Sequence, residues 1–318
     1  MANLKHSPIY EKWVTVVKEQ QKTIVAALEA IDGSKFRVDE WKRPNGGHGV
    51  SCVIEDGNVF ERGGVMVSVV HGVMSGAAAV AQMRASHASI PKDIDSLPYS
   101  AVGLSLIMHP KNPMAPTVHM NCRFLETFHP RTGEVELAWF GGGADLTPCY
   151  VYGDDARHFH GALRGVCDRH DAAYYPRFKA WCDEYFWNAH RSEARGVGGI
   201  FFDDLEASEG NLDSLFAFAR DVLRVFPETY VPIVQRRRGE PFTEAQKQWQ
   251  QLRRGRYVEF NLLHDRGTKF GLAGSTPRVE SILVSMPLTA SWKYYHEPEP
   301  GSREQELVKV LQKPKEWV

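Results

Sequence analysis

The spacing of apolar residues first changes near residue 33. Between residues 9 and 31 they recur at helical spacing, which predicts one long amphipathic helix that ends at Asp32-Gly33. From about residue 35 to 70, short apolar runs alternate with turn-forming pairs, a pattern typical of an antiparallel meander. The predicted breaks are Gly46-Gly47, Asp56-Gly57 and Gly63-Gly64, and further strands are predicted at 100–109, 117–127, 134–140, 198–204 and 256–263.

Helical patterns follow in the second half of the chain, at 154–190, 211–237 and 242–254, with a short helix after Ser302. Thr243 and Gln246 have the spacing of a capping box at the start of the third. Runs of strands followed by runs of helices favour an α+β fold over the alternation of a parallel sheet. Because the sequence contains no repeat and no long polar linker, residues 1–318 are predicted to form a single domain.

One predicted strand has an unusual polar face. In PTVHMNCRFLE, residues 116–126, side chains that alternate across a strand place His119, Asn121 and Arg123 together, opposite an apolar face. A solvated outer face is the plain interpretation. Such faces usually carry lysine, glutamate and threonine, so this combination of an acid/base group, an amide and a guanidinium also indicates a binding site.

The segment AVGLSLIMHP, residues 101–110, repeats this alternation. It places Gly103, Ser105, Ile107 and His109 on one face of a strand and larger apolar side chains on the other. If the two strands pair, their small and polar side chains would form the floor of a pocket.

Three consecutive glycines, Gly141 to Gly143, precede Asp145 in WFGGGADLTP. Glycine loses more conformational freedom on folding than any other residue, so such a run indicates a sharp turn or a close approach to a ligand. Asp145 would then be presented to that ligand on a glycine turn. The alternative is an aspartate that caps a turn or a helix.

Several arginines fall near predicted strand ends and turns: Arg123, Arg256, Arg266 and Arg278. Arginine suits bidentate recognition of carboxylates, and it stays charged at any physiological pH. Each of these residues taken alone could form an ordinary surface ion pair. Together with Asp145, they indicate a polyanionic organic substrate.

Composition excludes some classes of partner. The chain has 38 basic and 39 acidic residues, and this balance gives no support to nucleic-acid binding. Its five cysteines are odd in number and form no CxxC pair, which favours a reducing compartment. No apolar run approaches the ~20 residues of a membrane span, and the start MANLKHSPIYEKW does not resemble a signal peptide, so we expect a cytoplasmic protein.

Long motifs resemble a known family. WFGGGADLTP, HPKNPMAPTVHMNCRF, RYVEFNLLHDRGTKFGL and RVESILVSMP closely resemble the oxygen-dependent coproporphyrinogen III oxidases, and the likeness runs from about Phe60 to Pro287. The resemblance implies a large antiparallel β-sheet flanked by helices on both faces, assembled as a homodimer. It also implies conversion of two propionates of the tetrapyrrole to vinyl groups, with molecular oxygen as co-substrate and no organic cofactor. The absence of a dinucleotide fingerprint and of a P-loop agrees with the last point.

The resemblance also implies site residues. His119 matches the family's proton donor, and residues 257–278 match the segment associated with dimerisation. The positions that match substrate-contacting residues are Ser105, Asn121, Cys122, Arg123 and the tripeptide Thr276, Pro277 and Arg278, where relatives have Gly-Gly-Arg or Gly-Ser-Arg. Proline at 277 removes an N–H donor, which puts backbone contact at that turn in question.

We expect the glycines to lie against the flat tetrapyrrole, with Asp145 facing its pyrrole N–H groups. A histidine has an ordinary pKa of ~6.5, so His119 suits proton transfer near neutral pH. Arg123 and Arg278 would anchor propionates. The predicted catalytic residues are therefore His119, Asp145 and Arg123.

Other interpretations remain open at this point. His109, His119, His158 and His190 match positions proposed as metal ligands in bacterial relatives, but their spacing is not a compact ligand motif, so no metal is the favoured prediction. A non-catalytic tetrapyrrole carrier and a metal-dependent oxidase or hydrolase are the rival functions. The basic pair Arg253-Arg254 is interpreted as a solvated helix end.

Overall fold

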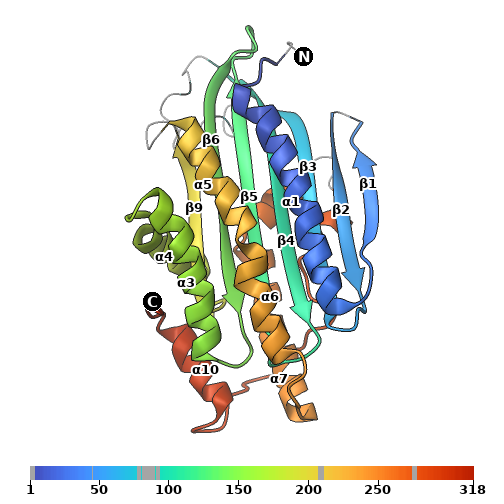
Figure 1. Ribbon diagram of the computed structural model, residues 1–318, viewed down its shortest axis with the longest axis vertical. Coiled ribbons are helices and arrows are strands. Elements are labelled where there is room, and N and C mark those ends of the chain that lie inside the picture. Colours follow the sequence, from blue (N-terminus) through green and yellow to red (C-terminus); the bar gives the residue numbers. More distant parts are fainter. Residues whose placement is uncertain are drawn as a thin grey trace.

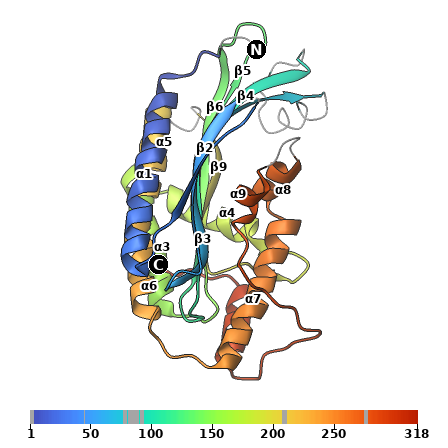
Figure 2. The same cartoon turned by 90° about the vertical axis from the view of Figure 1, so that its right-hand side faces the viewer.

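A seven-stranded antiparallel sheet lies between two layers of helices (Figures 1 and 2). The computed structural model describes residues 4–44, 46–76, 80, 90, 94–206, 211–273 and 278–318. In sheet order the strands are β1 (Arg37–Lys42), β2 (Gly47–Glu55), β3 (Phe60–Ser75), β4 (Ser96–Pro110), β5 (Thr117–Phe128), β6 (Val135–Thr147) and β9 (Gly198–Glu206). The short strands β7 (Trp187–Asn188) and β8 (Glu193–Ala194) pair separately. The predicted α+β fold, with helices on both faces of a large antiparallel sheet, is confirmed.

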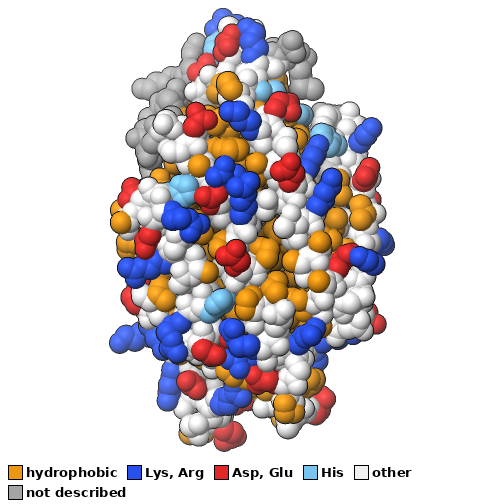
Figure 3. Space-filling view, viewed as in Figure 1, with side chains coloured by type: hydrophobic (Ala, Val, Ile, Leu, Met, Phe, Trp, Pro, Cys, Tyr) orange, Lys and Arg blue, Asp and Glu red, His pale blue; other side chains and the backbone are white. Residues whose placement is uncertain are grey.

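The helices divide between the two faces of the sheet (Figure 2). One face carries α1 (Pro8–Asp32), α3 (Gly153–His170), α5 (Leu212–Arg224) and α6 (Phe226–Arg237). On the other side lie α7 (Glu244–Leu263), α8 (Arg266–Ala273), α9 (Val279–Leu283) and α10 (Arg303–Gln312), whereas α4 (Tyr174–Tyr185) packs along the β9 edge and also contacts α3. Acidic and basic side chains are interspersed over the surface of the α1 layer (Figure 3).

The α1 layer covers the apolar face of the sheet. The predicted N-terminal helix is confirmed as α1, and it ends where Gly33 adopts a left-handed φ of 83°. Trp13 of this helix is fully buried and donates a hydrogen bond from Nε1 to the carbonyl of Val102 at 3.0 Å. The main core includes residues from Ile9 to Trp317, so both ends of the chain pack into it.

The second face of the sheet is polar, as the alternation along the sequence predicts. Burial alternates along β5, and Val118, with the other apolar side chains, faces the core. The predicted pairing of β4 with β5 is also confirmed, because Ser105 lies opposite Asn121 and Ile107 lies opposite His119 in the register. The polar side chains predicted from two separate segments therefore share one surface.

The prediction of a strand at 256–263 is wrong, because these residues form the last two turns of α7. The predicted capping box of Thr243 and Gln246 is present and starts a helix of 20 residues. The segment YVEFNLL contains one β-branched residue, and at helical spacing it buries Tyr257, Phe260 and Asn261 toward the sheet.

Three further predictions need correction. Gly63-Gly64 does not break the chain but lies inside β3, where a Cβ on Gly63 would come 2.5 Å from the sulfur of Met108. The helix predicted to reach residue 190 stops at Tyr185, before β7. The arginines predicted to be solvated are buried, because Arg253 pairs with Glu193 and Arg254 pairs with Glu61.

Candidate active site

The polar face of the sheet forms the floor of a cavity of about 380 Å³. Ser105, His119, Asn121 and Arg123 line it from β4 and β5, as the sequence predicts. Its opposite wall comes from residues 185–186, Phe201 and helices α7 to α9, so segments far apart in the sequence close over one surface.

His119 and Asp145 lie opposite each other on β5 and β6, and they are joined by a hydrogen bond. The Nδ1 of His119 is 2.9 Å from Oδ1 of Asp145 and donates to it when the carboxylate is ionised. On the other side of the ring, Nδ2 of Asn121 lies 3.3 Å from Nε2 of His119. The carboxylate thus fixes the ring tautomer, and Nε2 of the neutral ring accepts a hydrogen bond from the amide of Asn121.

Arg195, which the sequence analysis did not identify, completes this group. Its Nη2 donates to both oxygens of Asp145, at 2.7 and 2.9 Å, and its Nη1 donates to Oδ1 of Asn261 at 2.9 Å. The guanidinium stacks 4.1 Å from the ring centre of Phe186. Burial opposes ionisation of Asp145, but the charge of Arg195 and the hydrogen bond from His119 outweigh it and hold the pKa of this carboxyl below its ordinary value.

The position of Asp145 differs from the one expected for a group that contacts the ligand. Its side chain is 2% exposed, and it lies behind His119 and Arg195 instead of among the residues that line the cavity. In this arrangement the carboxylate orients the histidine and neutralises the arginine. Direct contact of Asp145 with pyrrole N–H groups stays a prediction.

Gly141 to Gly143 form the interior of β6 and not a turn. The physical reason for glycine is the close approach of neighbouring protein atoms: a Cβ on Gly141 would lie 2.3 Å from Oδ1 of Asp203, and one on Gly142 would lie 2.5 Å from the carbonyl oxygen of Asn121. The free space at Gly141 admits the ion pair of Asp203 with Arg123, whose N–O distance is 2.7 Å. None of the three glycines is among the residues lining the cavity.

The two residues that follow Asn121 differ in orientation. Arg123 is 36% exposed, whereas the side chain of Cys122 is fully buried on the core side of β5. Burial raises the pKa of the Cys122 thiol, which keeps it neutral. Because side chains alternate along a strand, Cys122 can offer a substrate its backbone but not its side chain.

Arg278 lies at the far end of the cavity, where its Nε donates to the hydroxyl of Ser281 at 3.1 Å and its Nη2 pairs with Asp39. The preceding Thr276 and Pro277 lie outside the described residues. The other two predicted arginines occupy different surroundings: Arg256 pairs with Glu259 within α7, and Arg266 is 63% exposed.

The four histidines considered as metal ligands do not converge. His109 is buried between Thr117 and the carbonyl of Ser285, and burial lowers its pKa to about 3. His158 contacts the carbonyl of Glu228, whereas His190 contacts Glu259 and His264. Within the described parts of the chain, no group of three or more His, Cys, Asp or Glu side chains is arranged to hold a metal ion.

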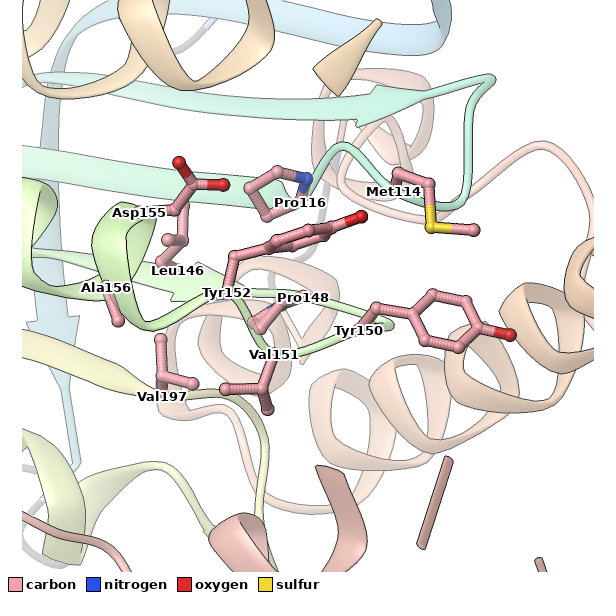
Figure 4. Close-up of a pocket in the computed structure, with 10 residues that line it drawn as sticks. All are labelled: Met114, Pro116, Leu146, Pro148, Tyr150, Val151, Tyr152, Asp155, Ala156 and Val197. Carbon is pink, nitrogen blue, oxygen red and sulfur yellow. The ribbon is translucent and has the colours of Figure 1, made fainter. Parts of the chain in front are cut away.

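The chain after Asp145 is held away from the cavity by a second, smaller core. Tyr150 is fully buried, and its hydroxyl donates to Glu304 at 2.5 Å. Figure 4 shows Tyr150, Tyr152 and Pro148 around a crevice whose cavity volume is about 10 Å³, room for a water molecule at most. This packing fixes the end of β6 and hence the position of Asp145.

Comparisons with known proteins agree with this architecture. The model of the family described as Coproporphyrinogen III oxidase matches residues 12–317. An oxygen-dependent coproporphyrinogen-III oxidase of Drosophila melanogaster is 50% identical over 95% of this chain and 77% of its own length. A mitochondrial one of Homo sapiens is 49% identical over 96% and 67%, and a chloroplastic coproporphyrinogen-III oxidase of Arabidopsis thaliana is 48% identical over 98% and 80%. With a family match over nearly its whole length, the chain belongs to the coproporphyrinogen III oxidase family.

Proposed function

We propose that the protein catalyses the reaction for which its relatives are named, the oxygen-dependent oxidation of coproporphyrinogen III in haem biosynthesis. Two propionates become vinyl groups, and the products are protoporphyrinogen IX, carbon dioxide and hydrogen peroxide. The observation that carries the proposal is the group of His119, Asp145 and Arg195 beside a cavity lined with arginine, in a chain about half identical to these oxidases.

The stoichiometry assigns a task to His119. Each propionate, –CH₂–CH₂–COO⁻, reacts with one O₂ and one proton to give –CH=CH₂, CO₂ and H₂O₂. Two electrons pass to oxygen, the C–COO⁻ bond breaks, and one C–H bond on the carbon next to the ring is lost. The balance requires one proton from outside the substrate, and we assign its donation to His119, which lines the cavity.

Asp145 and Arg195 together stabilise the protonated form of His119. The carboxylate accepts from Nδ1, so it stabilises the imidazolium that forms whenever Nε2 is protonated. Arg195 prevents Asp145 from taking the proton itself, since its charge holds the pKa of the carboxyl low after the cost of burial. Proton exchange is thereby confined to the cavity side of His119.

The polar groups on the cavity floor suit the substrate's carboxylates. Arg123 lies on β5 and Arg278 directly precedes α9; both line the cavity, and both guanidiniums can bind a carboxylate in bidentate geometry. The amide oxygen of Asn121 is buried and has no hydrogen-bond partner among the described residues. An N–H group of a bound tetrapyrrole would satisfy it, which gives Asn121 a second role beside His119.

No organic cofactor is part of this proposal, and a metal is not favoured. Oxygen is the oxidant, and the electron-rich substrate supplies the electrons. Chelation tests this directly: protein treated with a chelator and freed of metal by gel filtration should keep its turnover. Activity that returns only on addition of a divalent metal would contradict the proposal and support a metal-dependent oxidase.

The deciding experiment is aerobic turnover of coproporphyrinogen III, read as protoporphyrin fluorescence after oxidation of the product, with an oxygen-free sample in parallel. We expect product only with oxygen, and a loss of roughly 10²-fold or more in kcat for His119→Ala. His158→Ala is the matched control, since its ring contacts a backbone carbonyl of α6 away from the cavity. Tight binding of the substrate without any product would favour a carrier instead.

We also propose that the protein forms a homodimer through the region 257–278. Two apolar side chains at the end of α7, Leu262 and Leu263, are 47% and 53% exposed. The neighbouring ring of Trp292, which donates to Glu259 of α7, is 55% exposed. Adjacent exposed apolar groups of this kind are typical of an interface between subunits.

Light scattering coupled to size-exclusion chromatography tests the dimer. We expect twice the chain mass for the natural protein and monomer for Leu262→Glu/Leu263→Glu. Phe242→Glu, an equally exposed apolar position before α7, is the control and should leave the mass unchanged. A monomer in the natural protein would contradict the proposal.

A cytoplasmic location is the last part of the proposal. All five cysteines are free and buried, which suits a reducing compartment. No helix in the described ranges is long and apolar enough to cross a bilayer. Because relatives carry the names mitochondrial and chloroplastic, fractionation of cells that express the natural gene is the test, and recovery in an organelle would contradict the proposal.

A further inference from the structure

The edge of the cavity formed by β1 and β2 carries polar groups that the motifs of the family do not explain. Trp41 and Arg43, at the end of β1, line the cavity together with Ser51 of β2. The sheet register places Trp41 in the same row as Arg123, with β2, β3 and β4 between them. Four strand spacings separate the two residues by ~19 Å across the sheet.

Two donors at this edge have no acceptor. Among the residues that the structure describes, Nε of Arg43 and Nε1 of Trp41 are buried and lack a hydrogen-bond partner. Buried donors of this kind are costly, and native proteins usually satisfy them with protein, water or ligand. Both groups can only donate, so the partner they lack is an acceptor.

The charge at this edge is positive. The guanidinium carbons of Arg43 and Arg278 lie 5.7 and 5.1 Å from the centre of the Trp41 ring. Asp39 pairs with Arg278, whereas Arg43 has no carboxylate partner in the described part of the chain. Two guanidiniums beside one indole ring, with one acidic partner, leave a net charge suited to an anion.

The indole is held in place by its packing. Gly49, the residue opposite Trp41 in the register, has no side chain, and a Cβ there would lie 2.3 Å from Cζ2 of the indole. The ring therefore lies directly on the backbone of β2. A rigid donor at a fixed position favours one ligand orientation and lowers the entropy lost on binding.

We propose that Trp41 and Arg43, together with Arg278, form a carboxylate site that holds a propionate of the substrate remote from His119. This inference rests on the proposed function for the identity of the ligand. The site and His119 line one continuous cavity, so a single ligand can reach both. A tetrapyrrole with four propionates around its rim would place one at the reacting position while another lies at the β1 edge, where its carboxylate would accept from the guanidinium groups of Arg43 and Arg278 that line the cavity.

Binding of coproporphyrin III, the unreactive oxidised ring, tests the site without turnover. Porphyrin fluorescence anisotropy would give its Kd for the natural protein and for Arg43→Gln and Trp41→Phe, which remove donors but retain most of the side-chain volume. We expect Kd to rise roughly tenfold for Arg43→Gln and about threefold for Trp41→Phe. Lys42→Gln is the matched control, because this neighbour is exposed and is not among the cavity-lining residues.

The tetramethyl ester of coproporphyrin III separates carboxylate binding from packing of the ring. Both ligands are measured in one detergent-containing buffer. The ester should bind the natural protein more weakly than the acid, and Arg43→Gln should weaken it no further. Arg43→Lys should recover part of the affinity for the acid. Equal Kd values for Arg43→Gln and Lys42→Gln would overturn the proposal, as would an equal loss of acid and ester binding in Arg43→Gln.

Turnover distinguishes failure of this site from failure of the proposed function. In the aerobic assay Arg43→Gln should raise KM by about the same factor as Kd and leave kcat within roughly twofold, because the substitution is remote from His119. If the natural protein binds coproporphyrin in the expected pattern but forms no product, the function is wrong and the carboxylate site stands. If it forms product and Arg43→Gln behaves as Lys42→Gln does, the site is wrong and the function stands.

Discussion

Replacing Arg195 by glutamine should destabilise the protein by about 3–5 kcal/mol, the usual cost of removing one partner from a buried ion pair. Both side chains of the Arg195–Asp145 pair are 2% exposed, so solvent cannot replace the lost charge. The substitution also removes a donor from Asn261 and the stacking on Phe186. For a chain of 318 residues this cost corresponds to a decrease in Tm of roughly 5–8 °C.

The pH dependence of this loss can be worked out from Asp145. Its pKa in the folded protein is lowered, so the pair contributes stability above the ordinary carboxyl pKa of about 3.9. That contribution is lost as pH falls through the lower folded value. The difference in unfolding free energy between natural protein and Arg195→Gln should therefore be full at pH 7 and shrink below about pH 4. Urea unfolding at several pH values measures it.

A double-mutant cycle attributes the effect to the pair. Asp145→Asn/Arg195→Gln removes both charges, so it should be more stable than the sum of the two single variants predicts. Arg191→Gln is the control, because Arg191 is 37% exposed in its pair with Glu259 and should cost about 1 kcal/mol or less. Equal Tm values for Arg195→Gln and the natural protein, or strictly additive single variants, would refute the reasoning. Loss of kcat should accompany the loss of stability, since the unpaired carboxylate can take the proton from His119.

Three other changes have defined outcomes. Asp145→Asn should lower kcat more than KM if the carboxylate orients His119, whereas direct contact with substrate would raise KM, as aerobic turnover would show. Gly141→Ala should lower the free energy of unfolding by roughly 1–3 kcal/mol, because the new Cβ would lie 2.3 Å from Asp203. The control is Gly165→Ala, which has open space around it and should be neutral or stabilising in thermal unfolding. Glu259 has a pKa lowered to about 2 by its hydrogen bonds against the cost of burial, so it stabilises the protein above about pH 4.5. The stability lost in Glu259→Gln should therefore shrink as pH falls from 5 toward 2, and a constant difference in urea unfolding would contradict this.

The sequence could predict the floor of the cavity because strand alternation is a local property. His119, Asn121 and Arg123 are two residues apart, so their common face follows from period two alone once the segment is a strand. Pairing with β4 could be raised as a hypothesis because that segment has the same alternation, and the structure supplies the register. Each of these conclusions needed only one or two short stretches of sequence.

The opposite wall could not be predicted in this way. Arg195 lies in the connection between β8 and β9, and its partners come from β6 and α7. Only the folded chain brings these elements together. Asn261 was placed on a strand because YVEFNLL is apolar, yet a capping box 14 residues before Tyr257 had already started the helix that contains it. Tertiary burial of one helix face decided the outcome over local composition.

The glycines before Asp145 correctly indicated a close approach, but the approaching group was expected to be a ligand. Their cost indicated a close approach, and the structure has one, but the approaching atoms belong to Asp203 and to the neighbouring strands. A sequence pattern can report that space is needed at a position without reporting what fills it.

The cavity can lie between sheet and helices because most of its charges are already paired. Arg195 is neutralised by Asp145, and Arg123 is neutralised by Asp203, so neither guanidinium carries the full cost of desolvation alone. Among the described residues that line the cavity, the buried side-chain atoms without a hydrogen-bond partner are the amide oxygen of Asn121 near His119 and the donors of Trp41 and Arg43 at the β1 edge. An acceptor on β5 and guanidiniums at the β1 edge match a ligand that carries both pyrrole N–H groups and carboxylates. Under the proposed function, a carboxylate bound beside Arg43 and Arg278 would balance the positive charge that Asp39 alone leaves at this edge.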